Sequence, residues 1–245
     1  RNLLLSKIHK PPSYDFESFD NSIHRLWCIN DATFIEELTS LFKKVNAIYI
    51  ADGHHRMGAM GYINQKNPSN KKFMIAAFPS NESKIFDYNR VIKDLNGLTK
   101  NEFINILSND FKITNKDSAF RPGKKNEFGM YHDHQWYALE FISSTISNNF
   151  IDTLDINILN NFCFTKILNI KDVNNDERIR FIAGCHGLGA LEKKVNDNPD
   201  SVAFSIFPSE ITDVIKVADN NLTMPPKSTW FDPKPLDGLV VYEFE

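Results

Sequence analysis

The residues best suited to chemistry form one short segment, Asp52-Gly53-His54-His55-Arg56. The apolar run Ala47 to Ala51 precedes this segment, and apolar residues at helical spacing follow it. A helix start carries free backbone N–H groups and a partial positive charge, so it is a ready site for an anion. An anion cradle, a carboxylate and compensating cations are the parts of a phosphoryl-transfer site.

Each residue of this turn has a role in that interpretation. Gly53 permits the tight turn and the close approach of the backbone to a phosphate, and Arg56 is a bidentate phosphate partner. Asp52 could hold Mg²⁺ or accept a hydroxyl proton. His54 and His55 could donate hydrogen bonds to phosphate or carry a proton near neutral pH. We therefore take Asp52, His54 and His55 as candidate catalytic residues.

Two other interpretations of the turn stay open. In the first, Asp52 only caps the helix and the histidines are surface residues. In the second, the turn binds zinc, but His54 and His55 are adjacent rather than four residues apart, and no third ligand stands in register.

The expected elements around the turn alternate irregularly between strands and helices. We expect an α+β fold with a mixed sheet, because the alternation is too irregular for a Rossmann fold or a TIM barrel. Neither G-x-G-x-x-G nor G-x-x-x-x-G-K-[ST] occurs. The expected strands are 23–29, 47–51, 72–78, 84–91, 111–114, 136–142, 178–183, 202–207 and 239–244, and the expected helices are 33–44, 57–63, 99–107, 152–169, 187–195 and 211–218. We predict a single domain over 1–245, or a core at 20–120 with a C-terminal subdomain at 121–245.

Composition excludes several classes of protein. The 245 residues include 28 Lys and Arg against 31 Asp and Glu, a net charge of −3, which argues against a protein that coats nucleic acid. No apolar run approaches the roughly 20 residues that span a bilayer. The three cysteines are scattered and odd in number, which argues against a disulfide framework and for a reducing compartment. We expect a cytoplasmic protein without nucleic-acid or membrane partners; the sequence does not predict the oligomeric state.

Four blocks of the sequence resemble one protein family. They are Ile50-Ala51-Asp52-Gly53-His54-His55-Arg56, the run from Phe86 to Gly97, Leu154 to Leu159, and the run from Met224 to Lys234. Together, in this order, they resemble the bacterial and archaeal family called domain of unknown function 1015. The family's upstream block with His and Glu has no counterpart here. The resemblance therefore implies that this chain corresponds to the C-terminal part of such a protein, or to a short member.

The Asp-Gly-His turn is also similar, more distantly, to the nucleotide-phosphate turn of the ParB/sulfiredoxin superfamily, which includes free-serine kinases of the SerK type. This resemblance implies a ParB/sulfiredoxin-like core that binds ATP or ADP with Mg²⁺, with phosphates at Gly53 to Arg56. In those kinases a glutamate upstream of the turn is the base. Glu36 and Glu37 lie upstream here, but on the outer face of an expected helix, so no residue of this chain is assigned as the base.

Two further groups of residues are candidates for the same site. Lys227, Ser228 and Thr229 follow Pro225-Pro226, which fixes an extended backbone, and they present a cation and two hydroxyls to a substrate. Asn89 and Arg90 are candidate cofactor-binding residues, Arg90 reaching a phosphate or pairing with Asp87 or Asp94. Rigid surface turns and local ion pairs are the structural alternatives.

Three other features are interpreted as structural. His132-Asp133-His134 occupies an expected hairpin turn, where adjacent ligands rarely all face one metal ion. Cys185-His186 is adjacent in sequence, whereas a nucleophile pair needs contact through space. Asp155 begins an expected helix, where it complements the helix dipole; a position facing the site is the alternative.

The sequence thus predicts a nucleotide-dependent phosphotransferase that acts on a small hydroxylated metabolite, with free L-serine as the substrate suggested by resemblance. The alternatives are a ParB-like nucleotide-binding or regulatory module without turnover, and a structural remnant that binds no nucleotide.

Overall fold

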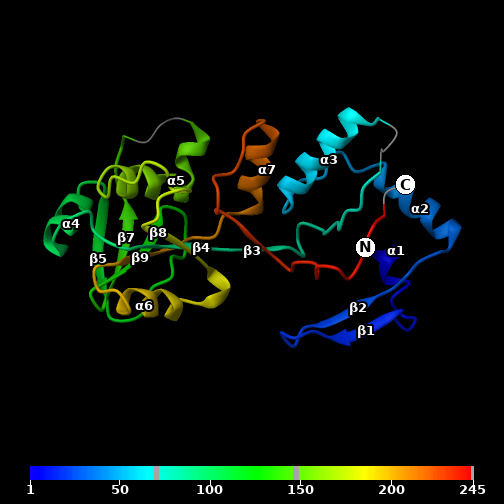
Figure 1. The fold of residues 1–245 in the computed structure, drawn as a ribbon, viewed down its shortest axis with the longest axis horizontal. Helices are drawn as coiled ribbons and strands as arrows, with labels where there is room; N and C mark the ends of the chain where they lie inside the picture. Colours follow the sequence, from blue (N-terminus) through cyan, green and yellow to red (C-terminus); the bar gives the residue numbers. More distant parts are fainter. Residues whose placement is uncertain (69–71, 146–148, 244–245) are drawn as a thin grey trace. The chain divides into compact units, whose positions relative to one another are not determined.

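The computed structural model describes residues 1–68, 72–145 and 149–243 (Figure 1). Helices and antiparallel sheets combine in the α+β fold predicted from the sequence. The predicted mixed sheet is wrong, because every strand pair among the described residues is antiparallel. The chain divides into two compact units, Arg1–Ile50 and Ala51–Glu245. This boundary differs from the division considered near residue 120. The largest sheet of the structure combines strands that precede residue 120 with strands that follow it, so the chain does not divide there.

The smaller unit contains two helices and a hairpin. These are α1 (Asn2–Leu5), β1 (Tyr14–Glu17), β2 (Ile23–Leu26) and α2 (Ala32–Phe42). The two strands pair antiparallel, Tyr14 opposite Leu26. Helix α2 begins where it does because Asp31 accepts a hydrogen bond from the Phe34 backbone, as an N-cap residue does. Phe34 is buried, and the Lys7 ammonium lies 4.7 Å from the centre of its ring.

The larger unit is built on a six-stranded antiparallel sheet with the order β5-β7-β6-β9-β4-β8. A separate two-stranded ladder joins β10 to β3. The strands are β3 (Lys84–Phe86), β4 (Tyr88–Ile92), β5 (Phe111–Lys116), β6 (Glu127–His132), β7 (Gln135–Phe141), β8 (Ile179–Ala183), β9 (Val202–Ile206) and β10 (Trp230–Asp232). The helices are α3 (His54–Lys66), α4 (Lys100–Leu107), η1 (Phe150–Thr153), α5 (Asp155–Leu159), η2 (Asn160–Thr165), η3 (Gly184–His186), α6 (Gly189–Asn196) and α7 (Ile211–Asp219).

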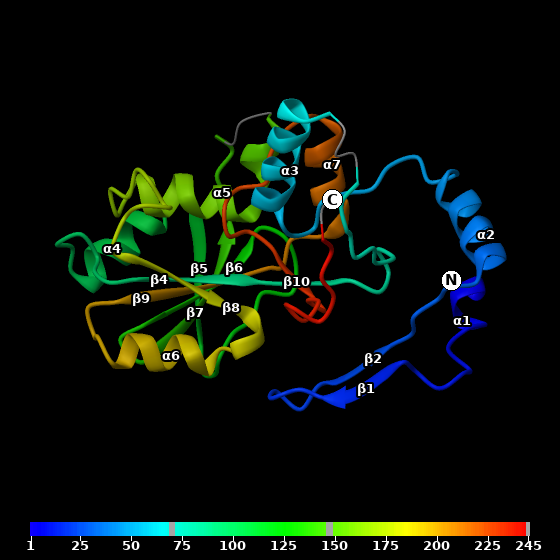
Figure 2. The same ribbon diagram turned by 45° about the vertical axis from the view of Figure 1, so that its right-hand side comes forward.

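Helices cover both faces of the large sheet. Figures 1 and 2 show α4 and α5 on one face and α6 on the opposite face. Side chains alternate between the faces along β4: Ile92 joins the core under α4 and α5, whereas Val91 joins the cluster under α6. By the same alternation Arg90 shares the face of Ile92, and Asn89 shares the face of Val91.

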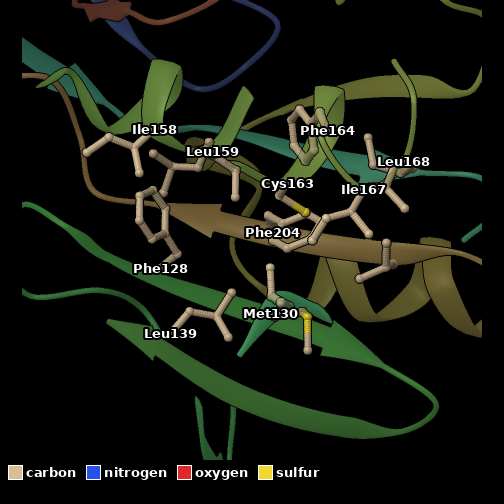
Figure 3. Close-up of a cluster of buried hydrophobic side chains, with 14 of the residues drawn as sticks. Phe128, Met130, Leu139, Ile158, Leu159, Cys163, Phe164, Ile167, Leu168 and Phe204 are labelled. Atoms are coloured by element: carbon tan, nitrogen blue, oxygen red, sulfur yellow. The ribbon is translucent and has the colours of Figure 1, made fainter. Parts of the chain in front are cut away.

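The main core lies between the sheet and the helical segment formed by α5 and η2. Figure 3 shows Ile158, Leu159 and Phe164 from that segment above Phe128 and Phe204 from the strands. All five side chains have an exposed fraction of 0%. The Phe164 and Phe204 rings meet edge to face, with centres 5.4 Å apart. This core fixes the sheet on which β4 and its neighbours are built.

The helix predictions are largely confirmed. The predicted capping box is present at α4, where Thr99 and Glu102 bond reciprocally. The predicted helix over 152–169 divides into a 3₁₀ turn, the short α5 and a π-helical segment, η2. Within the described residues, no helix has both the length and the apolar character that crossing a bilayer requires.

Three strand predictions are wrong. Residues 47–51 and 72–78 have no strand structure and are exposed, with Ile48 61% and Ile75 51% exposed. Residues 239–243 likewise form no strand, and residue 244 lies outside the described residues. The apolar pattern of these segments is real, but among the described residues no neighbouring strand pairs with them. The strand predicted over 84–91 is interrupted at Asp87, between β3 and β4.

Candidate functional site

The Asp52 turn has the local geometry expected at a helix start. Gly53 adopts the left-handed conformation with φ of 86° and precedes the 13-residue helix α3. A glycine suits this position because L side chains rarely adopt that conformation. Asp52 Oδ1 accepts a hydrogen bond of 2.8 Å from the Gly53 backbone N–H. No side chain among the described residues caps α3, so the N–H groups of its first turn are left for another partner.

Charged side chains surround this turn. The Lys234 ammonium lies 2.8 Å from Asp52 Oδ2, and this hydrogen bond is the main reason that the pKa of Asp52 is lowered. Asp52 is therefore ionised at neutral pH. The Arg56 guanidinium folds back over Gly53, because a Cβ added to that glycine would lie 3.0 Å from Arg56 Nε.

The two histidines of the turn are open to solvent. His54 and His55 are both exposed, and within residues 1–68, 72–145 and 149–243 neither side chain has a hydrogen bond or an ion pair. The turn thus combines one carboxylate, one guanidinium and two titratable rings at an uncapped helix start. The buried strand that was predicted to lead into the turn is absent, so the turn follows exposed chain.

Arg90 is placed differently from the sequence expectation. Its side chain has an exposed fraction of 0%, and its guanidinium donates to the backbone oxygens of Tyr88 and Lys227. It pairs with neither Asp87 nor Asp94, and its Nε has no hydrogen-bond partner in the part of the chain that the structure describes. Burial lowers the pKa of Arg90 to about 9, which leaves it cationic at pH 7. In this position Arg90 holds the backbone at Lys227 rather than facing solvent.

Asn89 is also buried and bonded to protein. Its side chain donates to Asp87 Oδ2 at 2.6 Å and accepts from the Ile206 backbone at 3.0 Å. Asp87 in turn forms an ion pair of 2.8 Å with Arg121. These bonds use the polar groups of Asn89 that were predicted to bind a cofactor. Through the bond to Ile206, Asn89 joins β4 to β9.

The loop that contains Lys227, Ser228 and Thr229 connects the sheet with the Asp52 turn. At one end of this loop the Arg90 guanidinium donates a hydrogen bond to the Lys227 backbone oxygen. At the other end Lys234 forms its ion pair with Asp52. Ser228 is buried, and its hydroxyl donates to the Pro225 backbone oxygen at 2.6 Å. The Lys227 side chain is exposed and its ammonium lies 5.9 Å from the centre of the Tyr88 ring. Thr229 is partly buried.

The histidine cluster in the β6–β7 hairpin is engaged in local contacts. His132 is buried, and its Nδ1 lies 2.8 Å from the Ser201 backbone oxygen, while Asp133 forms an ion pair of 2.7 Å with Lys100. Across the described ranges, no group of three or more His, Cys, Asp or Glu side chains is arranged to hold a metal ion.

A small cavity of about 70 Å³ lies in the larger unit. Tyr88, Asp155 and Ser228 line it, and each of them comes from a different block of the family resemblance. From the sequence, Asp155 was predicted mainly to begin a helix, with a position facing the site as the alternative. The signal that could have identified it was its place within one of these blocks.

Asp155 is mostly withdrawn from water. Its Oδ1 accepts a hydrogen bond of 2.9 Å from the Asn126 backbone. Burial raises the pKa of Asp155 to about 7, with smaller upward contributions from the Asp213 and Glu210 carboxylates and a downward one from Lys125. An acid with a pKa near neutrality is suited to proton transfer or to charge-dependent binding.

The raised pKa predicts a pH-dependent effect of Asp155→Asn. The folded state holds this proton more tightly than the unfolded state, so the wild type loses stability as pH rises from about 4 to about 7. The loss is about 1.4 kcal/mol for each pH unit in that window. We expect the free energy of unfolding of the asparagine variant to rise relative to that of the wild type across the same pH window. Above pH 7 the difference between the two should become constant. Urea unfolding at pH 5 and pH 8 measures this; an equal difference at both values would contradict it.

Comparisons with known proteins come from sequence and from structure. No curated protein matches the sequence. The similar solved structures include a free serine kinase variant in complex with AMP, with 17% identity, a TM-score of 0.44, and coverage of 81% of this chain and 78% of that chain. They also include a conserved hypothetical protein from Pyrococcus furiosus, with 15% identity, a TM-score of 0.38 and coverage of 81% of each chain. A third is C-terminally truncated SbnI from Staphylococcus aureus, with 12% identity, a TM-score of 0.36, and coverage of 86% of this chain and 78% of that chain.

Similarity at this level does not establish a shared activity. The family comparison is stronger, because the model described as "Protein of unknown function (DUF1015)" matches residues 2–157, which is more than half of the chain. This match includes the Asp52 turn, β4 and Asp155. The chain belongs to the DUF1015 family.

Proposed function

We propose that the protein is a nucleotide-dependent phosphotransferase that acts on a small hydroxylated metabolite, with free L-serine as the leading candidate. The observation that carries this proposal is the uncapped start of α3, where Gly53 exposes the backbone and Asp52, His54, His55 and Arg56 gather around it. Such a helix start favours a phosphate, and the Arg56 guanidinium already lies over the same glycine. The resemblance of this turn to the ParB/sulfiredoxin nucleotide turn agrees with the assignment.

In this proposal ATP or ADP places its phosphates at Gly53 to Arg56. Asp52, which is ionised at neutral pH, orients the acceptor hydroxyl or holds Mg²⁺. One carboxylate is enough for Mg²⁺, because this ion commonly combines one or two carboxylates with phosphate oxygens and water. His54 and His55 neutralise the charge that develops during transfer.

The surrounding residues have supporting roles. Lys227 offers an exposed ammonium to the substrate or phosphate, and Thr229 a hydroxyl, whereas the Ser228 hydroxyl already serves the loop. We assign Asn89 and Arg90 a positioning role, since both are buried and bonded to protein. Arg90 sets the backbone of Lys227, and so orients the loop that leads to Lys234 and Asp52.

A nucleotide-binding or regulatory module without turnover is the second candidate. The observation in its favour is that no residue is assigned as the base. Glu36 and Glu37 are exposed on α2, in the smaller unit.

The two candidates differ in their product. The protein is incubated with L-serine and Mg²⁺–ATP or Mg²⁺–ADP, and phosphorus NMR follows the formation of a serine phosphate ester. A phosphotransferase yields this ester together with the nucleotide shortened by one phosphate. Nucleotide binding without any new ester, with serine and with other small alcohols, would reject turnover and leave the binding module.

A further inference from the structure

The cavity beside Asp155 has the size and lining of a site for a very small molecule. It measures about 70 Å³, whereas one water molecule needs about 10–15 Å³ of such space. Phe150, Ile156, Ile206 and Phe207 supply apolar walls, and Tyr88, Lys125 and Asp155 supply polar groups. Pockets that combine apolar walls with a few convergent polar groups are typical ligand sites.

Most polar groups around the cavity already have partners. The Lys125 ammonium lies 2.8 Å from Glu210 and 2.9 Å from Asp213. The hydroxyls of Ser209 and Ser228 donate to backbone oxygens. Asp155 differs, because only its Oδ1 accepts a hydrogen bond within the described part of the chain. Its Oδ2 therefore remains available to a ligand in the cavity.

The charges at this cavity favour a cation. Three carboxylates, those of Asp155, Glu210 and Asp213, stand against the single ammonium of Lys125. An ionised Asp155 thus leaves a local excess of negative charge, which disfavours an anionic ligand. A metal ion is disfavoured as well, since the described residues contain no converging set of three acidic or imidazole ligands. An organic ammonium needs only one carboxylate, and the apolar walls can pack against its carbon atoms.

We propose that this cavity binds a small primary amine in its ammonium form, with Asp155 Oδ2 as the counter-ion. The ligand class is that of short primary amines and amino alcohols that carry no carboxylate. The inference goes beyond the proposed function, because the cavity would hold an amine whether or not a nucleotide binds at the Asp52 turn.

The protonation of Asp155 makes this binding pH-dependent. The pKa of Asp155 is about 7, so its carboxylate is mostly neutral at pH 6 and mostly ionised at pH 8. Glu210, Asp213 and Lys125 are the other charged groups beside it. The ion pairs with Glu210 and Asp213 outweigh burial and raise the pKa of Lys125, so it stays cationic throughout. An alkylammonium also stays protonated at both values. The affinity for an amine should therefore rise about tenfold from pH 6 to pH 8.

Calorimetric titration with ethanolamine, in the absence of nucleotide, tests this proposal. Ethylene glycol is the neutral control ligand of similar size. Asp155→Asn removes the charge, and Asp152→Asn is the matched control, because it makes the same change three residues away and does not line the cavity. We expect millimolar or tighter binding of ethanolamine at pH 8, at least tenfold weaker binding by Asp155→Asn, and unchanged binding by Asp152→Asn.

Several results would overturn the amine site. They are no binding of ethanolamine in the millimolar range, equal binding of ethylene glycol, and equal affinity in wild type and Asp155→Asn. Because no nucleotide is present, each of these results leaves the proposal for the Asp52 turn untouched. Asp155→Asn should fold, since an asparagine can keep the Asn126 hydrogen bond and relieves a buried charge.

Discussion

Replacing Phe164 by alanine should lower the free energy of unfolding of the larger unit by about 3–5 kcal/mol. Phe164 is fully buried in η2, and its ring packs edge to face on Phe204 in β9 (Figure 3). The substitution removes the ring from the main core and leaves a cavity between the helical segment and the sheet. Because the core is close-packed, its neighbours can collapse into that cavity only in part.

Urea denaturation, followed by far-UV circular dichroism, measures this loss. Phe73→Ala is the matched control, because Phe73 belongs to the same unit but is 43% exposed. We expect its effect to stay below about 1 kcal/mol. A loss of similar size in the two variants would mean that the core is not where the structure places it.

The Asp52→Asn substitution should lower the kcat of nucleotide-dependent phosphorylation by about 10²–10⁴-fold, the usual contribution of a positioned acid or base. The asparagine keeps the size of the side chain and can still accept the hydrogen bond from Gly53. It removes the negative charge that orients the acceptor hydroxyl or holds Mg²⁺. The lost ion pair with Lys234 is exposed, so it should change stability by less than about 1 kcal/mol.

Turnover measured with saturating nucleotide and acceptor separates this effect from weaker binding. Asp237→Asn is the control, because it removes a carboxylate from an exposed position in the same C-terminal segment. An Asp52→Asn enzyme with the kcat of the wild type would reject the catalytic role of Asp52, provided that its unfolding curve is also unchanged.

The sequence predicted those helix starts that are determined by neighbouring residues. The capping box of Thr99 and Glu102 specifies the start of α4, and the left-handed Gly53 specifies the start of α3. The strands missing at 47–51 and 72–78 have another explanation. An apolar run indicates a tendency to be buried, but a strand also needs a partner, and partners are set by the whole fold.

The same reasoning applies to the candidate site. The Asp52 turn could be found from residue types, because its geometry depends on adjacent residues. Arg90 and Asp155 could be singled out only by their places within the family blocks, and their roles could not be predicted, because those roles depend on contacts far apart in sequence. Arg90 is buried because it lies on the core-facing side of the sheet, and its guanidinium donates to the Lys227 backbone oxygen. Asp155 accepts a hydrogen bond from the Asn126 backbone N–H. Neither contact leaves a pattern that a single sequence reveals.

The central claim is that the start of α3 binds nucleotide phosphates, and thermal unfolding with Mg²⁺–ATP and Mg²⁺–ADP tests it most directly. A nucleotide at about 100 times its Kd should add roughly 2.7 kcal/mol to the stability of the wild type. Arg56→Ala should lose this gain, whereas Arg180→Ala, which removes an exposed arginine on β8, should keep it. No stabilisation by either nucleotide, or the same stabilisation in Arg56→Ala as in the wild type, would contradict the claim.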